Sequence, residues 1–145
     1  MTQTYHLFIR ATPEQIWEAI TTPEYSARYL FGALVETTAQ TGTPFRYHSP
    51  DRTELWGDDT VLDADPPRRL VITYRGLYNP ELAAEPPSRV TWQIEPDQQG
   101  ASLLTVVHDE LDHAPKTAER VAGPGWMRVL SGLKTVLETG ESLNS

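Results

Sequence analysis

The stretch PGWMRVLSGLKTVLETG, residues 124–140, decides the fold. Its large apolar residues recur at intervals of four, three and four, which is one face of a helix: Trp126, Leu130, Leu133 and Leu137. Gly140 follows the pattern where glycine commonly caps a helix. We expect a helix over about residues 116–138, bent or interrupted at residues 123–125. Because its apolar stripe needs a partner, the helix must cover one face of a sheet.

The middle of the chain supplies that sheet. Six segments read as strands, with turn signals between them: roughly 33–38, 43–48, 54–64, 69–75, 88–95 and 101–110. Val90, Trp92 and Ile94 alternate with polar residues, as on a strand with one buried face. Short connections between the strands favour an antiparallel sheet with one polar face.

The N-terminal part adds a strand and two short helices. Residues 5–10 alternate as a half-buried strand, and Thr12-Pro13-Glu14-Gln15 then starts a helix with a capping pattern. A second short helix is expected at about residues 24–30. The whole predicts one α+β domain over residues 1–145, with six to seven strands and a long C-terminal helix. We expect the polar tail, residues 141–145, to be frayed.

Composition excludes several classes of function. The net charge is −8, and no basic stripe is present, so binding to nucleic acid is not expected. The chain has no cysteine, which removes disulfides and thiol chemistry. Neither a leader sequence nor an apolar stretch of transmembrane length is apparent. We therefore expect a soluble cytoplasmic protein, without membrane insertion, that is a monomer or a homodimer.

Four short stretches carry a resemblance to a known family: residues 11–20, 65–70, 125–126 and 133–140. Together and in this order, they resemble the helix-grip (SRPBCC) superfamily, which includes the START and birch-pollen-allergen-like domains. The branch most similar is the one named after the C-terminal domain of the activator of Hsp90 ATPase (AHSA1-like). The resemblance implies a curved antiparallel sheet that grips the C-terminal helix and leaves a cavity. It also implies apolar ligands such as lipids, polyketides or hormones.

Aromatic residues on or near the inward faces are the candidate ligand contacts, because each joins a large apolar body to few polar atoms. Plain core packing is the alternative interpretation, and the sequence does not separate a filled core from a hollow one. The candidate ligand-binding set is Trp17, Tyr29, Phe45, Tyr47, Trp56, Tyr74, Trp92, His108, Trp126 and Leu130.

His108 is the one polar member of that set. By strand alternation it shares a face with Leu104 and Val106, which we assign to the cavity. Three roles are open for it: a buried histidine satisfied by its neighbours, a hydrogen-bonding ligand contact, or a catalytic base.

No set of residues typical of an active site is found. The chain lacks a Gly-x-Ser-x-Gly elbow and a phosphate loop. Asp58 and Asp59 are adjacent carboxylates, but on a strand they point to opposite faces. His108 and Asp109 diverge in the same way, so no metal site is expected, and no cofactor is indicated.

Three functions stay open. We expect a protein that binds a small hydrophobic molecule, rather than an enzyme. The alternatives are an enzyme of cyclase, dehydratase or hydrolase type in the same cavity, with a proton moved by His108 or Tyr74, and a module that interacts with a chaperone. The first strand starts by residue 5, which leaves no room for an upstream partner domain and counts against the last alternative.

Overall fold

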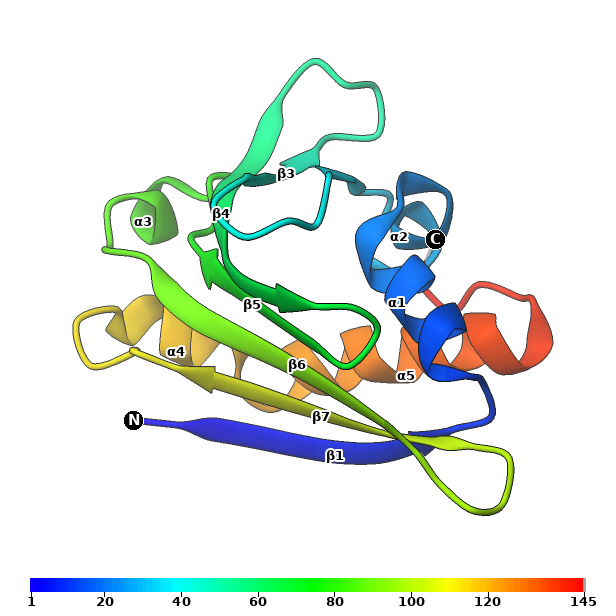
Figure 1. Cartoon of the computed structure of the whole chain (residues 1–145). Coiled ribbons are helices and arrows are strands. Elements are labelled where there is room, and N and C mark those ends of the chain that lie inside the picture. The colour runs from blue at the N-terminus through cyan, green and yellow to red at the C-terminus, as the bar shows by residue number, and fades with distance from the viewer. Residues whose placement is uncertain (145) are drawn as a thin grey trace.

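The computed structural model describes residues 1–144. Within them, seven strands form one antiparallel sheet in the order β1-β7-β6-β5-β4-β3-β2 (Figure 1). The strands are β1 (Gln3–Ile9), β2 (Leu34–Thr37), β3 (Pro44–His48), β4 (Leu55–Asp65), β5 (Arg69–Tyr74), β6 (Ser88–Pro96) and β7 (Ser102–Asp109). The six segments expected in the middle of the chain are confirmed, each with bounds within one or two residues of the prediction.

The helices differ from the expected order in two ways: the C-terminal helix is divided in two, and a short helix lies between β5 and β6, where the asparagine and prolines of residues 78–87 predict a loop. The helices are α1 (Pro13–Thr21), α2 (Pro23–Tyr29), α3 (Pro80–Ala83), α4 (Pro115–Val121) and α5 (Pro124–Thr139). The predicted capping pattern is present, because Thr12 and Gln15 exchange side-chain and backbone hydrogen bonds at the start of α1. The long C-terminal helix is interrupted at Gly123, whose φ of 56° is compatible with glycine but not with a continuing helix.

Helix α5 covers the inner face of the sheet. It crosses behind β5, β6 and β7 in Figure 1, while α1 and α2 close the end near β2. Trp126, Leu130 and Leu133 are buried in one core with alternate residues of β5, β6 and β7. The stripe that defined this helix in the sequence is therefore the contact that joins the two layers.

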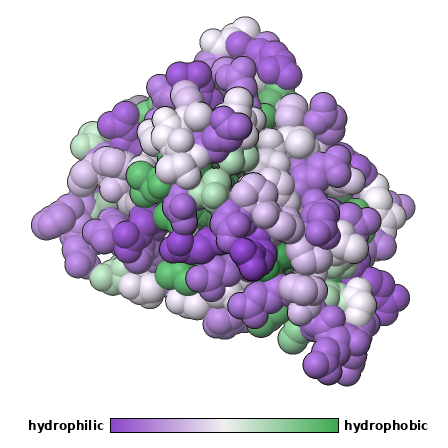
Figure 2. All heavy atoms as spheres, viewed as in Figure 1, coloured by the Kyte–Doolittle hydropathy of each residue, from purple (hydrophilic) through white to green (hydrophobic). Residues whose placement is uncertain are grey.

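The outer face of the sheet is polar, as an antiparallel sheet with one solvated side requires. On the side shown in Figure 2, hydrophilic residues dominate and apolar atoms reach the surface only in small, separate patches. None of the helices in residues 1–144 is long and apolar enough to cross a membrane.

Strand β4 forms the corner of the sheet. Its first half, residues 55–60, pairs with β3, and its second half, residues 61–65, pairs with β5. At the change of partner, the Thr73 hydroxyl takes the place of a backbone acceptor, because it accepts from the backbone N–H of Thr60 at 3.1 Å. Side chains rather than a regular ladder thus connect β4 to the end of β5.

The tail differs from expectation. Asn144 is buried, with 4% of its surface exposed, and its amide donates to the carbonyls of Tyr29 and Arg128. The Ser142 hydroxyl also donates to the carbonyl of Arg28. The prediction of a frayed tail is wrong for residues 142 and 144, because their polar side chains satisfy backbone carbonyls at the end of α2 and on α5. Ser145 lies outside the described residues.

Substitution of Leu133 tests the contact between α5 and the sheet. Leu133 has no exposed surface, so Leu133→Ala should lower the free energy of unfolding by about 2–5 kcal/mol, as other large-to-small core changes do. Met127 on the same helix is 53% exposed, and Met127→Ala should change it by less than about 0.5 kcal/mol. Chemical denaturation of both variants measures the difference, and equal losses would contradict the packing described.

Candidate functional site

A closed polar network lies where α5 meets the sheet. His108 on β7 has no exposed surface. The Trp126 indole donates to its Nδ1 at 3.0 Å, and its Nε2 lies 2.7 Å from the Ser88 hydroxyl. The Ser88 hydroxyl in turn donates to the Tyr74 carbonyl at 3.1 Å. Every donor in this series has one acceptor, which requires the proton of His108 to be on Nε2.

Burial keeps this imidazole neutral. It lowers the pKa of His108 to about 4, and the neighbouring Asp109 opposes the shift only weakly. Asp109 faces the other side of the strand, as expected, where it forms a two-point ion pair with Arg89. Of the three roles considered for His108, this geometry supports a histidine satisfied by its neighbours, since both ring nitrogens are engaged by protein groups.

Aromatic rings surround the network. Trp92 and Trp126 meet edge to face with ring centroids 5.6 Å apart, and Tyr74 meets His108 in the same way at 5.6 Å. Tyr5 adds a tilted contact with Trp126 at 6.2 Å. The structure thus brings together four of the residues that the sequence nominated, from β5, β6, β7 and α5.

A second aromatic group lies on β3. Phe45 is buried and packs against Tyr47, with ring centroids 5.3 Å apart. The Tyr47 ring lies over Gly57 of β4 so closely that a Cβ there would come within 2.5 Å of it. Burial raises the pKa of Tyr47 well above its usual value, and Asp59 and Tyr74 add to the shift. Tyr47 therefore lies close to the carboxylate of Asp59, which is also a neighbour of Gly57.

That carboxylate, Asp59, is the residue the sequence analysis missed. It lies on the inner side of β4 between Gly57 and Val61, and only 3% of its surface is exposed. Its Oδ1 accepts from the Thr73 hydroxyl at 3.0 Å, whereas Oδ2 is shielded from solvent and has no hydrogen-bond partner within residues 1–144. Such an atom is unusual, because buried polar groups are normally paired.

Burial dominates the electrostatics of Asp59. It raises the pKa of this carboxyl to about 7, although the Thr73 hydroxyl and Arg75 act in the opposite direction. Its neighbour Asp58 is exposed on the other face and pairs with Arg46 at 3.0 Å. The two carboxylates point to opposite faces as expected: Asp59 is buried, whereas Asp58 is exposed and paired with a cation.

The other nominated residues lie apart from this centre. Trp56 is half-buried at the irregularity in the pairing of β3 with β4, and no ring contact links it to the aromatic network within the described residues. Tyr29 is a core residue whose hydroxyl donates to the Ala19 carbonyl at 3.0 Å. Trp17 packs against the core from α1 and Leu130 lies within it, but no ring contact links Trp17 to the aromatic network within the described residues.

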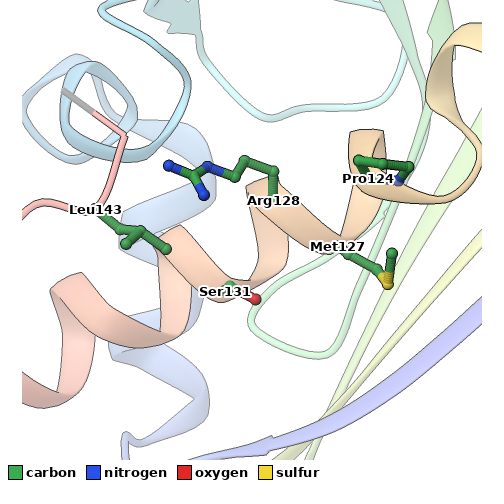
Figure 3. Close-up of a pocket in the computed structure, with 5 residues that line it drawn as sticks. All are labelled: Pro124, Met127, Arg128, Ser131 and Leu143. Carbon is green, nitrogen blue, oxygen red and sulfur yellow. The ribbon is translucent and has the colours of Figure 1, made fainter.

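Two hollows lie on the surface. One, of about 300 Å³, lies on the outer side of α5, where Figure 3 shows Met127 and Leu143 beside Ser131. The other, of about 640 Å³, lies at the turn between β6 and β7 beside Phe8 and Arg10. Neither is lined by the aromatic network. Within residues 1–144, no group of three or more His, Asp or Glu side chains is placed to hold a metal ion.

Comparison with known proteins agrees with this architecture. The family model of the activator of Hsp90 ATPase homolog 1-like proteins matches residues 10–138. The chain belongs to this family. No curated protein matches the chain. The family assignment confirms the resemblance found in the sequence.

Solved structures show the same fold at low sequence identity. Protein MLL2253 from Mesorhizobium loti is 22% identical, with 95% of this chain and 97% of that one covered and a TM-score of 0.76. The Aha1 dimer from Colwellia psychrerythraea is 16% identical, with 98% of this chain and 99% of that one covered and a TM-score of 0.75. PFC0360w, an HSP90 activator from Plasmodium falciparum, is 18% identical, with 94% of this chain and 96% of that one covered and a TM-score of 0.75. The helix-grip architecture is thus established, while the inner-face residues have to be interpreted from this chain.

The raised pKa of Asp59 has a consequence for stability. Between about pH 4 and pH 7 the folded chain keeps the proton that the unfolded chain releases, so folding is progressively disfavoured as the pH rises through this range. Asp59→Asn removes the effect and preserves the shape of the side chain. Relative to the wild type, this variant should gain about 2 kcal/mol of unfolding free energy between pH 5 and pH 8.

Denaturant titrations at the two pH values measure that gain. Asp58→Asn is the matched control, because it removes the same charge from the adjacent, exposed position. An equal gain in both variants would show that net charge, rather than burial of Asp59, is responsible.

Proposed function

We propose that this chain binds a small apolar molecule between the inner face of the sheet and α5, beside Tyr47 and Tyr74. The observation that carries the proposal is that these two tyrosines face the interior and pack against the core, yet remain partly exposed. Large aromatic surfaces that are both inward and accessible are what a small-molecule site provides.

The packing of the aromatic rings in the interior determines how a ligand would enter. The aromatic rings contact one another, so an entering molecule has to displace some of them. Tyr47 and Tyr74 are partly exposed, whereas Trp126 is buried and held by its hydrogen bond to His108. Binding would therefore move the tyrosines and leave the network of His108 in place.

The same network bears on the enzymatic alternative. A general base needs a ring nitrogen that reaches the substrate, and those of His108 face Trp126 and Ser88. Its pKa of about 4 also makes it a weak base. These features favour binding over proton transfer by His108.

Titration with N-phenyl-1-naphthylamine, a fluorescent apolar probe, tests the proposal. We expect saturable binding with one site per chain, and a loss of affinity of about fivefold or more for Tyr47→Ala and Tyr74→Ala, equivalent to about 1 kcal/mol. Met127→Ala is the control, because Met127 lines the hollow on the outer side of α5 in Figure 3. If Met127→Ala weakens binding and the tyrosine variants do not, the probe occupies the outer hollow and the proposal is wrong.

A chaperone partner is the second candidate function. It is favoured by the description of the matching family and by the Plasmodium falciparum neighbour, an HSP90 activator. If the first proposal is correct, addition of the purified chain to Hsp90 should leave the ATPase rate unchanged. A dose-dependent increase in that rate at micromolar concentration, retained in Tyr47→Ala, would support the chaperone function instead.

A further inference from the structure

Asp59 lies at a position where the regular structure of the sheet is open. The Thr60 N–H bonds to the Thr73 hydroxyl, and the Leu77 N–H bonds to the Trp56 carbonyl at 3.0 Å. Between these two hydrogen bonds, residues 57–59 of β4 pair with β3 on one side, while the chain after β5 passes on the other. The carboxyl group of Asp59 is thus held at the corner of the sheet by the Thr73 hydroxyl, which donates to Oδ1, and the backbone N–H of Arg75 also stabilises its charged form.

The free oxygen of Asp59 is next to the aromatic wall. The Tyr47 ring packs directly on Gly57, because a Cβ there would lie 2.5 Å from the ring and 3.4 Å from Oδ2 of Asp59. Oδ2 itself is shielded and unpaired within residues 1–144. The acceptor and the tyrosine ring are therefore neighbours on the inner side of β4, and a ligand reaches Oδ2 only by displacing the Tyr47 ring.

No cation in the described part of the chain neutralises this carboxylate. The ion pairs found there involve other acidic groups, and those of β4 itself, Asp58, Asp63 and Asp65, are on exposed surfaces. Arg75 follows β5 and lowers the pKa of Asp59 through its charge and its backbone N–H, but its guanidinium forms no ion pair with the carboxylate. A buried carboxylate without an ion-pair partner gains most from a group that brings both a positive charge and N–H donors.

We propose that Asp59 is the group that selects the ligand, and that the ligand is an apolar molecule carrying a basic amine. This inference rests on the binding function proposed above. The ammonium group donates to Oδ2 of Asp59 and lies against the face of Tyr47, which adds a cation–π attraction, while the apolar part contacts Tyr74 and its neighbours. The net charge of −8 also favours the approach of cations over anions.

Three naphthalene probes of matched size test this assignment: 1-naphthylmethylamine, 1-naphthalenemethanol and 1-naphthoate. Their affinities are measured by calorimetry at pH 8 for the wild type, Asp59→Asn and Asp58→Asn. In the wild type the amine should bind at least about tenfold more tightly than the alcohol, which corresponds to one charge-assisted hydrogen bond, and the carboxylate should bind most weakly. Asp59→Asn should bring amine and alcohol within about twofold of each other, and Asp58→Asn should retain the tenfold preference.

The outcomes separate this inference from the function on which it rests. If the alcohol binds as tightly as the amine in the wild type, the role of Asp59 is refuted and apolar binding stands; this comparison needs no variant. If Asp58→Asn removes the preference as fully as Asp59→Asn, the preference comes from net charge, and the assignment of Asp59 is also refuted. If none of the three probes binds the wild type, the proposed function is refuted together with the inference.

Discussion

The indole of Trp126 joins the two layers of the molecule by two kinds of contact. Its ring packs against Trp92, and its N–H donates to His108. Apolar burial holds a helix on a sheet but tolerates sliding, because it has no direction. A buried hydrogen bond has a direction, and it aligns the start of α5 with β7. Leu130 and Leu133 then follow one and two turns later, where the core requires them.

Two buried titratable groups of the interior, His108 and Asp59, differ in how fully their polar atoms are hydrogen-bonded. His108 is neutral, and both of its ring nitrogens have hydrogen-bond partners within the protein. Asp59 has one oxygen satisfied and one free. Leaving a buried acceptor unpaired costs about 1–3 kcal/mol, and more for a charged group. The folded chain therefore tolerates a local instability at Asp59 that it avoids at His108.

The two cases also show what the sequence allowed and what it did not. Periodicity was sufficient for the elements, because the stripe of α5 and the alternation of β7 are local patterns, and the inward position of His108 followed from them. The partners of His108 did not follow, since Trp126 and Ser88 are brought to it by the tertiary fold. Asp59 could have been found: once Val61 is assigned inward, residue 59 must be inward too. Alternation places Asp58 and Asp59 on opposite faces, but it does not show that Oδ2 of Asp59 lacks a partner, because that depends on the tertiary contacts around β4.

The fold alone cannot supply the ligand. The three solved structures compared above are 16–22% identical to the chain, a level at which they show a shared fold but no shared ligand. For the binding function proposed here, specificity has to come from the few polar groups that face an otherwise apolar interior. Where a strand is hydrogen-bonded to a neighbouring strand on both sides, its backbone N–H and C=O groups are paired, and its side chains pack against those of the neighbours. At the corner of β4 the partner changes, and side chains such as Thr73 fill the gap. A polar side chain placed there can face the interior without interrupting the pairing of the strands. Residues at this corner can therefore differ in polarity with little loss of core packing.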